Sequence, residues 1–314
     1  MPVPPHVFVL EAERLRYGQL VRDRQSYRFR SYREAALPRD PFHAGPLGGP
    51  LRDPAAFQAV VGALVQGLPG GPKGVKDASL VIPDAWLRVA FTEIGDLPRT
   101  AEQRDEVLRW KLRRLVPFRV DELRVGAVEV APLPVQEEPR RLLLGFAVEQ
   151  LLAQLEEAFA RQGVRLGQIS NVSLSLLPAL LPDRPGSFTG LVLAEPEGYT
   201  LVFSRGADPV LHRYKPFTGD LPEAARSSFV VRDLKLTRNF LDEHFSGSSF
   251  GRVLLVSPPE LEPVWLDRLE EGFGQSASPL DGRHLPPVRS EESQAPPWRD
   301  VAPMLGAIRQ EVAA

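Results

Sequence analysis

The sequence predicts an α/β protein in which a unit of three strands followed by one helix occurs twice. In the first copy, the strand-like runs and the helix span residues 6–10, 14–21, 26–32 and 53–67. In the second copy, they span residues 190–194, 199–204, 210–216 and 227–245. A compact αβ module lies between the two copies. This order of elements is the layout of a duplicated ribonuclease-H-like fold with an inserted subdomain.

The helix of the first copy is predicted from the residues at its two ends. Asp53 is a favourable N-cap, Pro54 occupies the first helical position, and Gly67 follows the last turn. Apolar residues recur at helical spacing along one face, at Phe57, Val60, Val61 and Leu64. We therefore expect this helix to cover one face of a sheet.

The C-terminal part of the chain continues the alternation of strands and helices. The run 252–257 is a predicted buried strand, and 260–273 is a predicted helix. Its apolar residues are four apart, at Leu261, Trp265, Leu269 and Phe273. The segment 276–297 is polar and rich in proline, so a loop is expected, and the tail 298–312 is predicted as a final helix.

The module between the copies has its own helix and strands. Thr100 and Gln103 form a capping-box pattern, and Pro117 ends the helix that follows. The expected buried stripe of this helix is Val107, Leu108, Leu112 and Leu115. Strands are predicted at 78–82, 87–94, 123–131 and 141–147, and a second helix at 150–162. The order β-β-α-β-β-α indicates a compact unit.

Composition excludes several classes of function. Lys+Arg 38 against Asp+Glu 40 leaves a net charge of -2, so no polybasic face for nucleic acid is expected. The absence of cysteine excludes disulfides, thiolate metal sites and cysteine nucleophiles. The histidines lack the spacing of metal ligands, so no metal is expected: His6, His43, His212, His244 and His284. No apolar run approaches ~18 residues, and the start lacks a signal-peptide pattern, so a membrane role is expected only through a partner.

The segment from Leu80 to Val130 carries a resemblance to a known family. It contains the pair Pro83-Asp84, a capped helix, and the run Leu115-Val116-Pro117-Phe118 at the helix end. A further match covers Leu142 to Val164, and another covers Asp300 to Ala307. In these features the chain resembles the PilM family of type IV pilus assembly proteins.

The resemblance implies an actin-like ATPase fold, related to that of FtsA, in three parts. Residues 1–76 and 165–182 would form the first actin-like domain, and 77–164 an inserted 1C-type subdomain. Residues 183–314 would form the second domain, with the last helix returning to the core.

The resemblance also implies a function. The chain would be a cytoplasmic scaffold of a pilus inner-membrane platform that binds the cytoplasmic tail of a PilN-like membrane protein. A GspL-like component of type II secretion and an actin-like ATPase with a divergent nucleotide site are the alternatives. Self-association and other proteins of the pilus machine are left open as further partners.

The nucleotide-binding turns of such a fold are degenerate in this sequence. Actin-like ATPases hold phosphates with Asp-x-Gly turns, because glycine lets backbone N–H groups approach closely. The residues found in place of these turns are carboxylates, a leucine and prolines, at Glu11, Glu13, Leu193, Glu195, Pro258 and Pro259. Glutamates repel phosphate, and prolines remove N–H donors. We therefore expect no bound cofactor and no ATPase activity, which makes the chain a pseudo-ATPase without catalytic residues.

Candidate partner-binding residues lie in the inserted module. They are large apolar residues around the capped helix, at Trp86, Trp110, Leu115, Pro117 and Phe118. The two tryptophans are either part of the core or anchors that line a groove for a peptide tail. Basic residues on the same helix either form its solvent face or contact acidic lipid headgroups or an acidic partner segment: Arg109, Lys111, Arg113 and Arg114.

Overall fold

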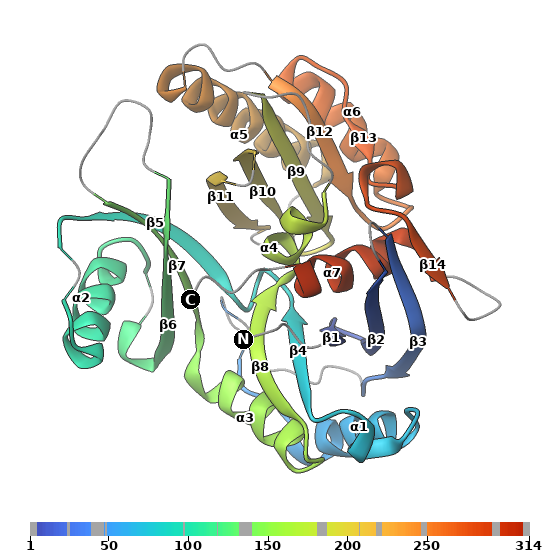
Figure 1. The fold of residues 1–314 in the computed structure, drawn as a ribbon. Coiled ribbons are helices and arrows are strands. Elements are labelled where there is room, and N and C mark those ends of the chain that lie inside the picture. The colour runs from blue at the N-terminus through green and yellow to red at the C-terminus, as the bar shows by residue number, and fades with distance from the viewer. Residues whose placement is uncertain are drawn as a thin grey trace.

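The computed structural model describes residues 5–23, 26–38, 47, 49–96, 98–117, 119–131, 140–180, 187–206, 208–217, 222–245, 250–290 and 296–309. The described residues form three sheets, two of them large, with helices between and around them (Figure 1). The predicted fold class, a duplicated ribonuclease-H-like fold with an inserted αβ unit, is confirmed by this arrangement.

The first large sheet has the strand order β14-β3-β2-β1-β4-β8. Its strands are β1 His6–Leu10, β2 Arg14–Asp23, β3 Ser26–Ala36, β4 Asp77–Ile82, β8 Arg165–Asn171 and β14 Val288–Ser290. The first three form an antiparallel meander, and β4 and β8 extend the sheet in parallel. Helices α1 Pro54–Gln66 and α3 Glu149–Ala160 pack together with one face of it around Phe8, Phe57 and Phe159. The Asp53 cap is confirmed, because its carboxylate accepts from the N–H of Ala56 at 2.9 Å.

The second large sheet repeats this pattern with the order β11-β10-β9-β12-β13. Its strands are β9 Phe188–Glu195, β10 Gly198–Arg205, β11 Asp208–Pro216, β12 Phe250–Val256 and β13 Ser278–Pro279. The outer face is covered by helices α5 Glu223–His244 and α6 Glu262–Phe273. Trp265, Leu269 and Phe273 of α6 are buried against the sheet, as their spacing predicts.

Two helices lie between the large sheets. They are α4 Val172–Leu176 and α7 Trp298–Arg309. One core cluster joins residues of both sheets to these helices, including Val9, Leu191 and Met304. The final helix therefore packs at the centre of the molecule, beside β1, β2 and β4 (Figure 1).

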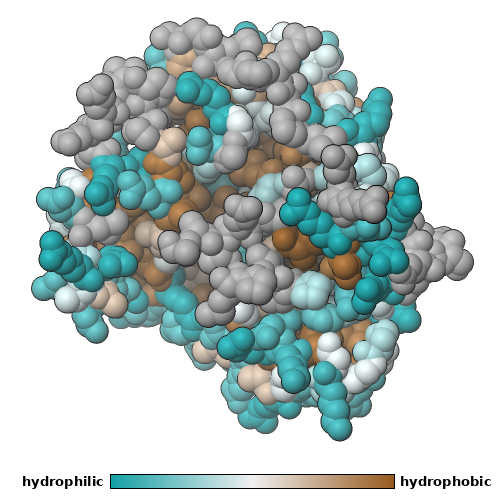
Figure 2. Space-filling model, in the orientation of Figure 1, coloured by the Kyte–Doolittle hydropathy of each residue, from teal (hydrophilic) through white to brown (hydrophobic). Residues whose placement is uncertain are grey.

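The inserted unit is a three-stranded sheet with the order β5-β7-β6 and one helix. Its elements are β5 Arg88–Ile94, α2 Ala101–Arg113, β6 Leu123–Val130 and β7 Arg140–Val148. The helix rests on the sheet through Leu108 and Leu112. Hydrophobic side chains are visible in the hollow between this unit and the second large sheet on the face drawn in Figure 2.

Three sequence-based expectations differ from the structure. The inserted module was expected to begin at residue 77, but Asp77–Ile82 is a central strand of the first sheet, paired with β1 and β8. The expected loop 276–297 contains β13 and β14, which are too short to show a period in the sequence. Leu115 was expected in the buried stripe of α2, but the helix ends at Arg113 and Leu115 is 49% exposed.

Candidate functional site

The first of the three candidate nucleotide turns joins β1 to β2. It is a tight turn, in which the backbone N–H of Glu11 donates to the carbonyl oxygen of Arg14 at 2.9 Å. The Glu11 carboxylate accepts hydrogen bonds from Arg14 Nε at 2.5 Å and from Arg16. Arg16 is buried and also pairs with Asp300 of α7, while Glu13 is exposed at the tip. The two arginines beside this turn therefore already have carboxylate partners within the chain.

The second candidate turn joins β9 to β10. Glu195 lies opposite Gly198 across the hairpin, which leaves Pro196 and Glu197 as the tip. Leu193, which was expected to stand at the position of the phosphate-site acid, lies inside β9 and is buried in the core between the sheets. The proline at the tip offers no backbone N–H to a phosphate.

Carboxylates from both turns influence one another. The pKa of Glu195 is raised to about 8, first by burial and then by the negative charges of Asp84, Glu197 and Glu11. The pKa of Tyr214 is likewise raised to about 12, by burial first and then by Glu195. The carboxylates of Asp84, Glu197 and Glu11 therefore lie close enough to Glu195 to favour the neutral form of its carboxyl.

The third candidate turn follows β12 and borders a cavity of about 360 Å³. Ser257, Pro259 and Glu262 line one side, and Trp298 and Arg299 of α7 line the other. The two consecutive prolines at this turn, where a glycine run was expected, remove two backbone donors. The cavity has the size of a small-ligand site, but Glu262 adds a further carboxylate beside it.

The acidic residues of the two hairpin turns are not arranged as a metal site in the described part of the chain. Within the ranges that the structure describes, no group of three or more histidine, aspartate or glutamate side chains is placed to hold an ion. Arg88 lies 4.7 Å from the centre of the Tyr214 ring, between the inserted unit and the second sheet. Acidic, aromatic and cationic side chains thus lie near one another beside the β9–β10 turn.

The Glu195 carboxyl predicts a pH dependence of stability. Its pKa rises from 4.5 in the unfolded chain to about 8 in the fold, so the folded state holds the proton more tightly. This contribution to stability is complete below pH 4.5 and is lost as the pH rises to 8. The glutamine of a Glu195→Gln variant does not titrate. Because the Glu195 carboxyl keeps some solvent contact, we expect the free energy of unfolding of this variant to fall by about 2 kcal/mol less than that of the wild type over this pH range. Urea unfolding of the wild type and the variant across this pH range measures the difference. Free energies of unfolding that change with pH in parallel for the two proteins would contradict the prediction.

A buried polar cluster joins the turn before the inserted unit to α4 and the second sheet. Asp84 precedes β5, Ser173 is in α4, and His212 is in β11. Asp84 accepts from the backbone N–H of Ser173 at 3.1 Å and also from its hydroxyl. The same hydroxyl lies 2.7 Å from His212 Nε2. These three residues belong to three segments that are far apart in the sequence, so the sequence analysis did not group them.

The cluster contains serine, histidine and aspartate but is not a catalytic triad. In a triad, the aspartate holds Nδ1 of the histidine, and the serine faces Nε2. Here both Asp84 and Ser173 lie at Nε2 of His212, and no hydrogen bond to Nδ1 occurs within the described structure. The His212 side chain is also 0% exposed, so no substrate reaches it. The cluster connects parts of the fold.

The predicted partner-binding residues lie in two different places. Trp86 is buried in the core beneath the first sheet, in the turn before β5. Trp110 is 50% exposed on α2, and Leu115 and Pro117 are exposed just beyond its C-terminal end. Phe118 lies outside the described residues. The structure therefore brings three of the five candidates to one end of α2 and separates Trp86 from them.

Basic residues surround the exposed tryptophan. Lys111 Nζ lies 5.5 Å and the Arg114 guanidinium 5.6 Å from the centre of the Trp110 ring. Arg109 instead points to its own unit, where it donates to Asp105 at 2.6 Å and to the carbonyl oxygen of Val120 at 2.8 Å. The basic cluster expected from the sequence thus divides into a structural arginine and an exposed cationic surface around an aromatic ring.

The insert sheet also has an exposed edge strand. β6 is the last strand in the order β5-β7-β6, and Val128 on it is 45% exposed. Edge strands present unpaired backbone groups to which an extended peptide can add. No helix in the described part of the chain is both long and apolar enough to cross a membrane.

Comparisons with known proteins agree with this architecture at the level of the fold. Neither protein-family profiles nor curated protein sequences give a match to this chain. Among solved structures, a PilM–PilN type IV pilus biogenesis complex is similar with a TM-score of 0.69 at 14% identity, over 98% of this chain and 97% of that chain.

Two further structures are similar at a lower level. The cytoplasmic domain of EpsL, an inner-membrane component of the Vibrio cholerae type II secretion system, has a TM-score of 0.49 at 9% identity, over 98% of this chain and 95% of that chain. A Bacteroides thetaiotaomicron protein with an actin-like ATPase fold has a TM-score of 0.49 at 10% identity, over 88% and 90%. The chain therefore shares the fold of the PilM–PilN structure over nearly its whole length.

Proposed function

We propose that this chain is a cytoplasmic scaffold of a type IV pilus inner-membrane platform, which binds the cytoplasmic tail of a PilN-like membrane protein and does not use ATP. The observation that carries the proposal is the likeness to the PilM–PilN complex, which covers 98% of this chain and 97% of that chain. The likeness includes both large sheets and the inserted unit, so no major element of this chain lies outside it.

The exposed end of α2 supports a binding role for the inserted unit. Trp110 and Leu115 are about half exposed, and Pro117 lies beside them. Large rigid aromatics are favoured anchors of protein interfaces, because they bury much area at a low entropic cost. The neighbouring cations Lys111 and Arg114 would favour a tail that carries carboxylates.

The acidic residues of the two hairpin turns support a scaffold that does not hydrolyse ATP. Glu11, Glu195 and Glu197 occupy the two hairpin turns where an ATPase needs free donors for phosphate. Arg16, the buried cation nearest to the first turn, is already bound to Glu11 and Asp300. These pairs would have to break before a phosphate could bind, which costs free energy.

We expect Trp110→Ala to weaken binding of the tail about 30-fold, or roughly 2 kcal/mol, because truncation of an anchoring tryptophan is typically among the most costly at an interface. Phe118→Ala is expected to act in the same direction. Fluorescence anisotropy of a labelled tail peptide of the PilN-like protein measures both. Trp298→Ala is the matched control, because Trp298 is also exposed, at 38%, but belongs to α7. Unchanged binding in both variants would show that this surface does not hold the tail.

A further inference from the structure

The cavity of about 360 Å³ that follows β12 is bordered by the first residues of two helices. Glu262 begins α6, and Trp298 and Arg299 begin α7. Most of the remaining lining is apolar and includes three prolines, Pro259, Pro279 and Pro297. An apolar cavity with a few well-placed polar groups is the usual form of a small-molecule site. The polar groups of this cavity therefore indicate which ligand it can take.

Two opposite charges line this cavity without pairing with each other. Within the described part of the chain, the Glu262 carboxylate takes part in no ion pair and accepts no hydrogen bond. The Arg299 guanidinium comes closest to a carboxylate at Asp300, where its Nε lies 3.7 Å from Oδ1, too far for a hydrogen bond. Asp300 is itself bound by the buried Arg16. The Arg299 guanidinium can therefore hold the carboxylate of a ligand through two parallel hydrogen bonds.

A hydroxyl group and an aromatic ring also border the cavity. The Ser257 hydroxyl is buried and has no hydrogen-bond partner within the described structure. Buried hydroxyls normally have a partner, and this one can accept from the N–H of a ligand. A Cβ on Gly282 would lie 2.6 Å from Cε2 of the Trp298 indole, so the ring packs directly on the backbone at that glycine. The indole therefore has a defined place at the edge of the cavity.

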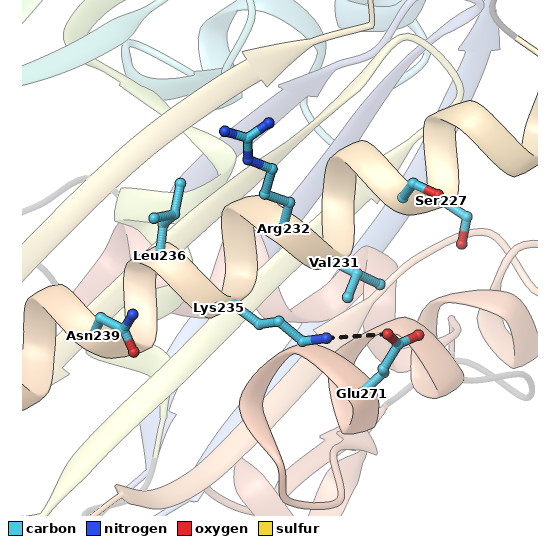
Figure 3. Close-up of a pocket in the computed structure, with 8 residues that line it drawn as sticks. Ser227, Val231, Arg232, Lys235, Leu236, Asn239 and Glu271 are labelled. Carbon is cyan, nitrogen blue, oxygen red and sulfur yellow. Dashed lines mark hydrogen bonds and ion pairs between the residues drawn. The ribbon is translucent and has the colours of Figure 1, made fainter.

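A groove of similar volume along α5 lacks this arrangement (Figure 3). Its carboxylate belongs to Glu271 of α6 and lies 3.2 Å from Lys235 Nζ, so it already has a partner. Arg232 lines the same groove but points away from Glu271 in Figure 3. The residues of this groove are therefore suitable controls for those of the cavity beside β12.

We propose that the cavity beside β12 binds a small zwitterion, either an apolar amino acid or a short apolar peptide. Its ammonium group pairs with Glu262 and donates to the Ser257 hydroxyl, and its carboxylate pairs with Arg299. Its side chain lies against Trp298 and the prolines, which exclude water and so strengthen both ion pairs. A ligand with a single charge would leave the opposite charge of the cavity unpaired. The proposal is independent of tail binding, which involves the inserted unit.

Calorimetric titration of the full chain with L-leucine and with the dipeptide leucyl-leucine tests the proposal. The expected result is saturable binding of at least one of them, with a dissociation constant of about 0.1–1 mM, as is typical of ligands of this size. Acetylation of the amino group or amidation of the carboxyl group should each weaken binding about tenfold, because each removes one ion pair. Tighter binding of leucine would identify a free amino acid as the ligand, and tighter binding of the dipeptide a short peptide.

Substitutions in the cavity assign each end of the ligand to its residue. Glu262→Gln should weaken binding about tenfold and should no longer distinguish the free ligand from the acetylated one. Arg299→Gln should have the same effect for the free and the amidated ligand. Trp298→Ala should also weaken binding, because it removes the aromatic wall on which the apolar side chain packs.

Matched controls separate this site from general effects of surface changes. Glu271→Gln and Arg232→Gln make the same changes in the groove along α5, and Trp110→Ala removes an exposed tryptophan from the inserted unit. All three should leave ligand binding unchanged, and circular dichroism should show that every variant is folded. Absence of binding up to about 10 mM ligand would overturn the proposal. Binding that is unchanged in both Glu262→Gln and Arg299→Gln would overturn it as well.

Discussion

Replacement of Gly306 by alanine is expected to destabilise the fold by about 3 kcal/mol or more, as severe overpacking of a core does. Gly306 lies in α7, where it faces α4 between the two large sheets. A Cβ at this position would overlap the carbonyl oxygen of Ser175 and lie 2.6 Å from its carbonyl carbon. The obstacle is backbone, so no side chain can turn aside to make room.

The sign of this effect makes the test decisive. In an ordinary helix, glycine to alanine stabilises by roughly 0.5–1 kcal/mol, because alanine loses less backbone entropy on folding. Urea unfolding of Gly306→Ala should instead show a large loss. Gly126→Ala is the control, since a Cβ there meets no atom within 4 Å. If Gly306→Ala were as stable as the wild type, α4 and α7 would not pack as closely as described here.

The second large effect is expected for Asp84→Ala, which should cost about 3 kcal/mol, because it leaves buried donors without an acceptor. Asp84 accepts from both the backbone and the hydroxyl of Ser173, and its carboxylate lies 3.5 Å from His212 Nε2. The loss should appear as a lower unfolding midpoint. Because His212 belongs to the second sheet, the variant should also have a weaker contact between the inserted unit and that sheet. Proteolytic cleavage of the segments that connect them should therefore become faster.

Two comparisons define the role of Asp84. Asp77→Ala removes a half-exposed aspartate that pairs with Arg165, and such surface pairs contribute at most about 1 kcal/mol. Ser173→Ala keeps the carboxylate but removes the hydroxyl that lies between it and His212, so an intermediate loss is expected. An Asp84→Ala protein no less stable than Asp77→Ala would contradict the view that the cluster ties the segments together.

The sequence predicted those elements whose signals are local. Two features can be recognised from neighbouring residues alone: the N-cap at Asp53 and the four-residue spacing of the α6 core residues. Both are present in the fold. The helix start at Thr100 is also local, and its hydroxyl accepts from the N–H of Gln103 at 3.4 Å. The repeat of three strands and a helix follows from such local signals, which is why the fold class could be predicted.

The features that the sequence did not predict depend on contacts between distant segments. β4 pairs in parallel with β8, about 88 residues away, so its place in the first sheet has no local sign. The burial of Leu193 inside β9 depends on the register of the β9–β10 hairpin, which has no local sign in the sequence. The Asp84–Ser173–His212 cluster unites three segments whose polar residues look ordinary in isolation.

The candidate binding site was only partly visible for the same reason. A helical period suggested that Leu115 is buried, but the helix ends two residues earlier, and the side chain is exposed. Trp86 and Trp110 could not be told apart by residue type, although one is in the core and the other on the surface. The cations that flank Trp110 were predicted as a cluster, while the anchoring of Arg109 to its own unit was not.

The central claim is that this chain binds the tail of a PilN-like protein through its surface while its nucleotide cleft stays unused. Calorimetric titration of that tail peptide into the full chain, with and without Mg-ATP, tests it most directly. We expect saturable binding with the same affinity in both titrations, because the proposed scaffold does not use ATP. Failure of the tail to bind, or an affinity that depends on Mg-ATP, would contradict the account.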